Sequence, residues 1–103
     1  MNYSLIIPIY NEERTLPALI DKLSNLKSDS IEVIVIDDGS DDKTKKILNK
    51  NNDFIVFRNK FNLGKGASII KGVEFASNKN IILIDGDLEI DVNEIKKLII
   101  KYE

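Results

Sequence analysis

The sequence contains no cysteine and no histidine among its 103 residues. The absence of cysteine excludes disulfides, thiolate nucleophiles and zinc sites built on thiolates, and it gives no information about the redox compartment. The absence of histidine excludes a histidine general base within this chain. Chemistry that depends on either side chain is therefore excluded.

Long apolar runs and an excess of basic charge are also missing. No apolar stretch approaches the roughly 18 residues that a membrane-spanning helix needs, and the first residues predict a strand rather than a signal peptide. The net charge is −2, whereas domains that bind nucleic acid usually carry a basic face. We therefore expect a cytoplasmic protein that does not bind nucleic acid.

Hydrophobic residues make up 43% of the chain and charged residues 31%, as is typical of a soluble globular domain. Four short runs rich in β-branched residues predict strands. The run Ile31–Ile36 is almost entirely apolar, as expected for a strand covered on both faces, and Pro8 is expected to close the first strand. The expected strands cover residues 3–7, 31–36, 54–57 and 80–84.

Segments in which apolar residues recur at helical spacing separate these strands. The first expected helix begins near residues 12–15, and the second follows Asp41 and Asp42, whose charges favour the positive end of a helix. A third helix begins at residues 64–66, and a fourth is expected over 91–102. The apolar stripes are Leu16, Leu19, Ile20, Leu23 and Leu26 on the first helix, and Ala67, Ile70, Val73 and Ala76 on the third.

Strands and helices alternate with short connections, which implies right-handed crossovers and parallel pairing of the strands. We therefore expect an α/β fold in three layers, with a largely parallel sheet of four strands between helices. No linker, repeat or low-complexity tract divides the chain, so residues 1–103 are expected to form one domain.

Parallel pairing places the loops that follow the strands at one edge of the sheet, where open α/β sheets bind ligands. Asp85 and Asp87 directly follow the fourth expected strand. Two carboxylates this close repel each other unless a cation lies near them, and Mg²⁺ or Mn²⁺ bound by carboxylates, water and phosphates is the usual solution. The pair therefore predicts a divalent metal that binds a diphosphate. The other three loops cover residues 8–13, 37–40 and 59–66.

Each of these other loops also has a simpler interpretation. The segment 38–40, Asp-Gly-Ser, is most often a turn with a helix cap. The Gly-Lys-Gly segment at 64–66 is a weak signal that also fits a flexible helix start. Tyr10 fits a half-buried aromatic residue at a strand end, and Glu12 fits a solvated acid in a first helical turn. A solvated helix face accounts for Lys43, Lys45, Lys46 and Lys50.

Four motifs occur in order along the chain: IIPIYNEE at 6–13, VIDDGS at 35–40, NLGKG at 62–66 and DGD at 85–87. Together they resemble family 2 glycosyltransferases of the GT-A fold, and most closely the dolichyl-phosphate mannose synthase type of polyprenyl-phosphate glycosyltransferase. The order and spacing match over essentially the whole chain. Four ordered motifs are far more specific than any one of them.

The resemblance implies roles for residues in three of the loops. Pro8, Tyr10 and Glu12 would hold the nucleoside, with the acid on the ribose hydroxyls. Asp38 would hydrogen-bond the base, and Lys65 would lie near the diphosphate.

The resemblance also implies that Asp85 and Asp87 are the catalytic acids, which hold Mn²⁺ or Mg²⁺ against the two phosphates of the donor. The cation would act as a Lewis acid on the departing nucleoside diphosphate. Glu89 would complete the metal shell. Glutamine is commoner at that position in the family, so Glu89 is a departure that adds negative charge.

The implied reaction is the transfer of a hexose, with inversion, from a UDP- or GDP-linked sugar to an acceptor such as a polyprenyl phosphate at the membrane surface. Family enzymes continue for at least as many residues again, in a second half that supplies the acceptor pocket. The chain resembles the donor-binding half of such an enzyme. We therefore expect it to be peripheral to the membrane and to need a second copy or a complementing subunit for catalysis.

Three other classes of protein share features with this sequence. A non-catalytic module that binds a nucleotide or nucleotide–sugar would keep the same residues without turnover, and this alternative stays open. A phospho-receiver domain is disfavoured because it would need acids where Pro8 and Asn59 stand after the first and third strands. A dinucleotide-binding domain is disfavoured because no Gly-x-Gly-x-x-Gly follows the first strand.

Overall fold

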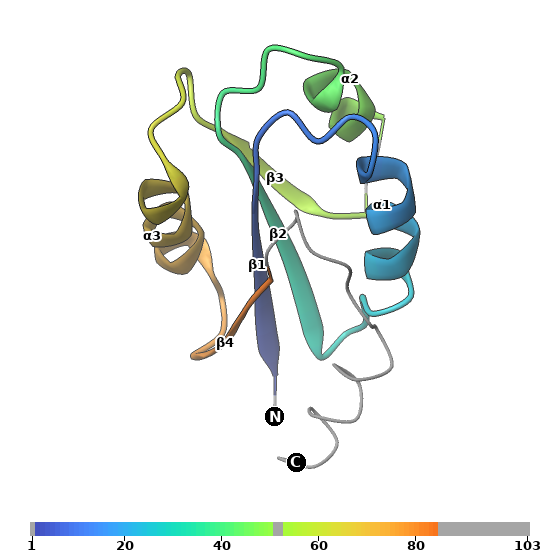
Figure 1. The fold of residues 1–103 in the computed structure, drawn as a ribbon. Coiled ribbons are helices and arrows are strands. Elements are labelled where there is room, and N and C mark those ends of the chain that lie inside the picture. Colours follow the sequence, from blue (N-terminus) through green and yellow to red (C-terminus); the bar gives the residue numbers. More distant parts are fainter. Residues whose placement is uncertain (1, 51–52, 85–103) are drawn as a thin grey trace.

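The computed structural model describes residues 2–50 and 53–84, and Figure 1 shows strands and helices that alternate along this part of the chain. The alternation expected from the sequence is confirmed. The fourth expected helix, over residues 91–102, lies outside the described residues. The elements are β1 (Tyr3–Ile9), α1 (Leu16–Ser24), β2 (Ile31–Asp37), α2 (Thr44–Asn49), β3 (Ile55–Arg58), α3 (Lys65–Phe75) and β4 (Asn80–Leu83).

The strands form one sheet in the order β3-β2-β1-β4, and each neighbouring pair is parallel. β1 lies in the interior of the sheet, with Ile6 opposite Ile34 of β2 on one side and Leu83 of β4 on the other. Because the strands are parallel, their carboxyl ends point to the same edge of the sheet. The expected α/β fold with a parallel four-stranded sheet is therefore confirmed.

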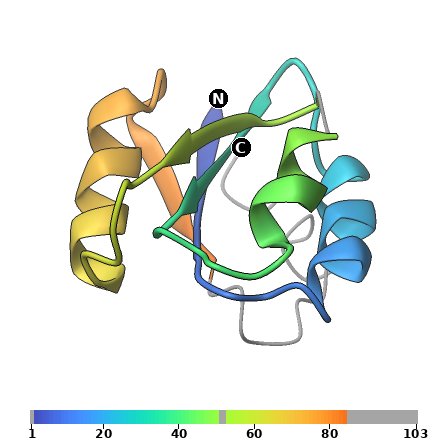
Figure 2. The same cartoon turned by 90° about the horizontal axis from the view of Figure 1, so that it is seen from above.

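Helices cover both faces of this sheet. Figures 1 and 2 show α1 and α2 on one face and α3 on the other. Successive residues of a strand point to opposite faces, so Leu5 and Ile7 pack in one core cluster, while Ile6 packs with Ile34 and Ile36 in a second. The stripe predicted for the first helix is confirmed, because its four leucines are buried in the first cluster and its isoleucine packs against them.

The prediction that Pro8 closes the first strand is wrong, because β1 continues through Pro8 to Ile9. Proline has no N–H to donate to a neighbouring strand. Ile9 O accepts a hydrogen bond from Asp38 N on the β2 side (2.9 Å), and Ile6 O accepts one from Ile84 N on the β4 side (3.0 Å). Residues two apart in a strand face the same neighbour. Pro8 therefore lacks its N–H on the β4 side, past the last described β1–β4 pair.

The large residues of the apolar stripe predicted for the third helix do not face the sheet, although Ala76 packs against the second core cluster. Ile70 is 62% exposed and Val73 is 46% exposed, whereas Ser68 and Gly72 are buried. A Cβ atom on Gly72 would lie 2.5 Å from Cγ2 of Ile6, so the glycine allows the helix backbone to approach β1 closely. Small residues therefore form the close contact between α3 and β1, and Phe75 at the end of α3 stacks on Phe57 of β3.

Candidate functional site

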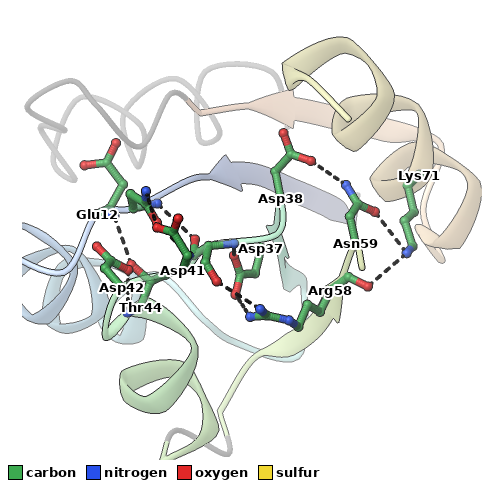
Figure 3. A network of polar contacts seen from close by, with 11 residues as sticks. Glu12, Asp37, Asp38, Asp41, Asp42, Thr44, Arg58, Asn59 and Lys71 are labelled. Atoms are coloured by element: carbon green, nitrogen blue, oxygen red, sulfur yellow. Dashed lines mark hydrogen bonds and ion pairs between the residues drawn. The ribbon is translucent and has the colours of Figure 1, made fainter. Parts of the chain in front are cut away.

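Loops that follow β1, β2 and β3 meet at the carboxyl edge of the sheet. We call this edge the rim and define it by residues 10–15, 38–43 and 59–64. Figure 3 shows that polar side chains from these loops form a network of hydrogen bonds and ion pairs. The prediction that separate loop motifs converge on one edge is confirmed for these three loops.

Asn11 connects the first loop to the second. Its backbone N–H donates to Ser40 Oγ (2.9 Å), its Nδ2 donates to Asp41 Oδ1 (2.8 Å), and its Oδ1 accepts from Asp41 N (2.9 Å). Asn11 has a φ of 51°, a left-handed conformation that asparagine adopts more readily than most residues. These contacts fix the tight turn that directly follows Tyr10.

Glu12 connects the first loop to the start of α2. Its N–H donates to Thr44 Oγ1 (2.9 Å), and its carboxylate accepts from Thr15 Oγ1 (3.1 Å). Asp42 accepts from Thr44 N (2.8 Å) and from Glu13 N (3.4 Å). Burial alone would raise the pKa of Asp42, but these hydrogen bonds lower it below its ordinary value. Asp42 therefore accepts the first backbone N–H of α2 in its charged form.

Asp37 is the last residue of β2, is 1% exposed and forms an ion pair with Arg58 (Oδ2 to Nη1, 2.7 Å). The strand register places the two residues opposite each other. Asp37 Oδ1 also accepts from Ser40 N (3.0 Å), and Arg58 Nη2 donates to Ser40 O (2.9 Å). A buried charge away from water is costly unless it is paired. The ion pair therefore stabilises Asp37 and fixes the turn that carries Asp38.

The carboxylate of Asp38 is 4% exposed and holds the third loop. Its Oδ1 accepts from Asn59 Nδ2 (2.8 Å) and from Leu63 N (2.8 Å), and its Oδ2 accepts from Gly64 N (2.9 Å). Asp38 therefore binds the chain that enters α3 and does not cap the start of α2. A carboxylate offers about four acceptor positions, and these donors use three of them.

The five residues predicted to contact a nucleotide lie at or next to the rim. Pro8 is buried near the end of β1, Tyr10 follows that strand with 40% of its surface exposed, and Glu12 lies in the first loop. Asp38 follows β2, and Lys65 is the first residue of α3. The fold brings all five to one edge of the sheet, while their contact with a nucleotide stays a prediction.

The predicted metal ligands Asp85, Asp87 and Glu89 lie outside the described residues, so their role also stays a prediction. In the part of the chain that the structure describes, no group of three or more acidic side chains could hold a metal ion. Within residues 2–50 and 53–84, every helix falls short of the length and apolarity that a membrane crossing requires.

Three residues that the sequence did not identify as functional, Arg58, Asn59 and Lys71, complete the network in Figure 3. A signal for Arg58 exists, because a carboxylate at the end of an apolar strand needs a cation nearby. The sequence does not show which basic residue supplies it, since that depends on the register of β2 against β3. The predicted solvated face was correct, because its four lysines are all exposed.

A second polar cluster lies at the opposite end of the sheet, beside a hollow of about 410 Å³. Glu32 accepts hydrogen bonds there from Ser4 Oγ (2.6 Å), Ser77 N (2.9 Å) and Ser77 Oγ (3.0 Å). Burial would raise the pKa of Glu32, but the hydrogen bonds lower it below its ordinary value. Glu32 joins β2 to the segment between α3 and β4, far from the rim.

A parallel sheet with a polar rim at its carboxyl edge is the arrangement in which open α/β proteins bind ligands. Residues 4–103 match the family model described as glycosyl transferase family 2. The chain therefore belongs to glycosyl transferase family 2, and the resemblance carried by its four motifs is confirmed.

Two relatives illustrate the family. The undecaprenyl-phosphate 4-deoxy-4-formamido-L-arabinose transferase of Yersinia pestis is 34% identical over 104 residues, which cover 93% of this chain and 32% of the relative. The prophage bactoprenol glucosyl transferase homolog of Escherichia coli is 34% identical over 110 residues, which cover 100% of this chain and 36% of the relative. The chain thus spans about a third of the length of these relatives.

Solved structures agree with the fold. Residues 1–349 of S. aureus TarS in complex with UDP match with a TM-score of 0.84 and 26% identity, over 97% of this chain and 31% of that one. The same protein in complex with UDP-GlcNAc matches with a TM-score of 0.83 and 27% identity, over 97% of this chain and 30% of that one. This similarity confirms the GT-A type of fold.

Proposed function

We propose that the rim binds the nucleoside diphosphate of a sugar donor. On this proposal residues 1–103 are the donor-binding half of a glycosyltransferase that transfers a hexose. The observation that carries the proposal is the joining of three strand-end loops in a chain of glycosyl transferase family 2, the first to the second through Asn11 and the second to the third through Asp38. TarS, which has the same fold, was solved with UDP and with UDP-GlcNAc.

The acceptor proposed is a polyprenyl phosphate. The relatives described above are named as transferases that act on undecaprenyl phosphate or bactoprenol, and both are about equally similar to this chain. A lipid phosphate acceptor would bring the rim to the membrane surface. The remaining two thirds of such an enzyme would supply the acceptor pocket.

The nucleoside is proposed to lie between the first two loops. The exposed ring of Tyr10 and the carboxylate of Glu12 offer an apolar surface and a hydrogen-bond acceptor for the ribose. Asp38 has one acceptor position that its three chain donors do not use. Uracil and guanine each present a ring N–H that this position would accept.

The diphosphate is proposed to lie between Lys65 and the acids that follow β4. Asp85 and Asp87 are oxygen donors of the kind that Mg²⁺ and Mn²⁺ prefer, and the strand leading to them is parallel to β1. Glu89 would add a third carboxylate to the same site. When bound, the cation would neutralise the negative charge of the departing diphosphate as a Lewis acid.

Calorimetric titration of the chain with UDP and GDP, in the presence of Mn²⁺, tests the proposal. We expect one of the two nucleotides to bind, and Asp85→Ala or Asp87→Ala to reduce its affinity at least tenfold. Asp21→Ala removes an exposed acid of α1 and is the matched control, with no expected effect. Failure of both nucleotides to bind would refute the proposal, and equal affinity in all four proteins would refute the metal site.

A further inference from the structure

Asn59 lies immediately after β3, is 4% exposed and makes three hydrogen bonds through its side-chain amide. Its Nδ2 donates to Asp38 Oδ1 (2.8 Å) and to Ser68 Oγ (3.0 Å). Its Oδ1 accepts from Lys71 Nζ (3.2 Å). Figure 3 shows Asn59 between Asp38 and Lys71, with its two amide atoms turned toward different partners.

Lys71 determines which way this amide points. A lysine ammonium group can only donate hydrogen bonds, so the oxygen of Asn59 must face Lys71. The nitrogen is then turned toward the carboxylate of Asp38, where a donor is required. Lys71 Nζ also lies 3.5 Å from Arg58 O, which keeps the ammonium group at the end of β3. These hydrogen bonds connect Lys71 of α3, through Asn59 after β3, to Asp38 in the loop after β2.

Asn59 hydrogen-bonds the carboxylate of Asp38, which in turn binds the residues that lead into α3. Asp38 accepts from the backbone N–H groups of Leu63 (2.8 Å) and Gly64 (2.9 Å), and Lys65 follows directly. If the carboxylate rotates away, Leu63 N–H loses this acceptor, and Gly64 N–H keeps only its longer hydrogen bond to Asn62 Oδ1 (3.2 Å). The position of Asp38 therefore fixes the distance between the second loop and the first turn of α3.

We propose that Asn59, oriented by Lys71, is a positioning residue that couples the base-contacting end of the rim to the phosphate-contacting end. Asn59 holds the Asp38 carboxylate in the orientation that keeps Leu63, Gly64 and the start of α3 in place. This inference rests on the proposed function, because the two ends meet one ligand only if a nucleotide binds across them. Neither Asn59 nor Lys71 touches that nucleotide.

The variant Asn59→Asp should give a pH-dependent change in nucleotide affinity, which a loss of packing would not produce. It keeps the size of the side chain and the acceptor for Lys71, but it replaces the donor facing Asp38 with a second carboxylate oxygen. The charged groups around this pair are Asp38 and Lys71, while Arg58 is engaged by Asp37 and Ser40 O. At lower pH one carboxyl group takes up a proton, and its O–H restores a donor between the two oxygens.

We therefore expect Asn59→Asp to weaken nucleotide binding about 10- to 100-fold at pH 7.5, as for a lost hydrogen bond to a charged group. At pH 5 the ratio of its affinity to that of the unmodified chain should recover to within about threefold. The control is Asn78→Asp, which makes the same change in a part-buried side chain bonded to Tyr3 O and Ser4 Oγ, at the other end of the sheet. This control should bind normally at both pH values.

The NMR signals of the Leu63 and Gly64 backbone amides, measured in nucleotide-free protein, test this inference separately from the proposed function. We expect both signals to move in Asn59→Asp at pH 7.5 and to return toward their original positions at pH 5. If the unmodified chain binds neither UDP nor GDP, the proposed function fails, and these signals still decide whether Asn59 positions the loop. Signals that do not move in Asn59→Asp would overturn the positioning role.

Lys71→Met and Lys71→Arg provide a second test in case Asn59→Asp does not fold. The methionine keeps much of the side-chain volume but removes the donor to Asn59 Oδ1, so we expect a 3- to 10-fold loss of nucleotide affinity. The arginine keeps a donor and should restore affinity to within about twofold. Equal affinity of the unmodified and Lys71→Met proteins, or no rescue by arginine, would overturn the role of Lys71 in orienting Asn59.

Discussion

Replacing Gly39 with alanine places a methyl group between two loops of the rim. A Cβ atom there would lie 2.5 Å from Phe61 C, 2.7 Å from Asn62 N and 2.9 Å from Phe61 O. These are backbone atoms, so the contact can be relieved only if one loop moves. Gly39 also has a φ of 73°, a left-handed conformation that costs a residue with a side chain about 1–2 kcal/mol.

The expected loss of stability combines the strained backbone with the steric overlap. Overpacking of this kind typically costs about 1–3 kcal/mol, so Gly39→Ala should lower the free energy of unfolding by about 2–5 kcal/mol. Domains of this size are stable by only about 5–15 kcal/mol, which makes the loss easy to detect. Urea unfolding followed by circular dichroism at 25 °C measures it.

Two other glycines of the same region separate the two contributions. Gly64 has a φ of 98°, but no atom of the described residues lies within 4 Å of the position that an alanine Cβ would take, so Gly64→Ala should show only the conformational cost of about 1–3 kcal/mol. Gly66 has neither a positive φ nor a close atom among the described residues, so Gly66→Ala in the first turn of α3 should be neutral or stabilising by up to about 1 kcal/mol. A loss in Gly39→Ala below about 2 kcal/mol, which the left-handed conformation alone would explain, would refute the close packing of the two loops.

Two further substitutions test the polar contacts that support the sheet. Arg58→Met should lower the free energy of unfolding by about 2–4 kcal/mol, because it leaves the buried carboxylate of Asp37 without its cation. Urea unfolding of Arg58→Met combined with Asp37→Asn should show a smaller loss than Arg58→Met alone, and a larger loss would contradict the pairing. At the other end of the sheet, folding lowers the pKa of Glu32 below its ordinary value of 4.5. The stabilisation that ionised Glu32 contributes is therefore present above pH 4.5 and is lost as the pH falls through the lower pKa of the folded protein. Stability measured from pH 6 to pH 3 should therefore fall more steeply in the unmodified chain than in Glu32→Gln, and parallel curves would show that Glu32 contributes nothing.

The fold was predictable because each local pattern agrees with the global arrangement. Ile31–Ile36 is apolar except for Glu32 and forms an interior strand, and the leucines of the stripe on the first helix recur at helical spacing and are buried. Boundaries differed by one or two residues, as is usual for sequence-based assignment. Pro8 was the exception, because only the pairing of β1 with its two neighbours shows that its missing N–H is not needed on the β2 side.

The side of α3 that faces the sheet was not predictable from apolar spacing. Ile70 and Val73 form a regular stripe, yet the sheet contacts Ser68 and Gly72 instead. The hydroxyl of Ser68 accepts a hydrogen bond from Asn59 (3.0 Å), which no pattern of hydrophobicity indicates. A helix contact made through small and polar residues cannot be predicted from the spacing of apolar residues.

The candidate site was predictable at the level of loops but not of contacts. Motifs after β1, β2 and β3 identified the rim, and the fold brings them together. The partners of Asp37 and Asp38 depend on strand register and on side-chain orientation, which the sequence does not specify. The predicted metal ligands lie outside the described residues and remain predictions.

A crystal structure of the chain grown with Mn²⁺ and the nucleotide selected by titration tests the central claim most directly. An anomalous difference map locates the manganese independently of the surrounding atoms. We predict a manganese peak shared by the carboxylates of Asp85 and Asp87 and by the diphosphate, with the base against Asp38. A nucleotide bound away from the rim, or a rim without manganese beside a bound diphosphate, would contradict the account.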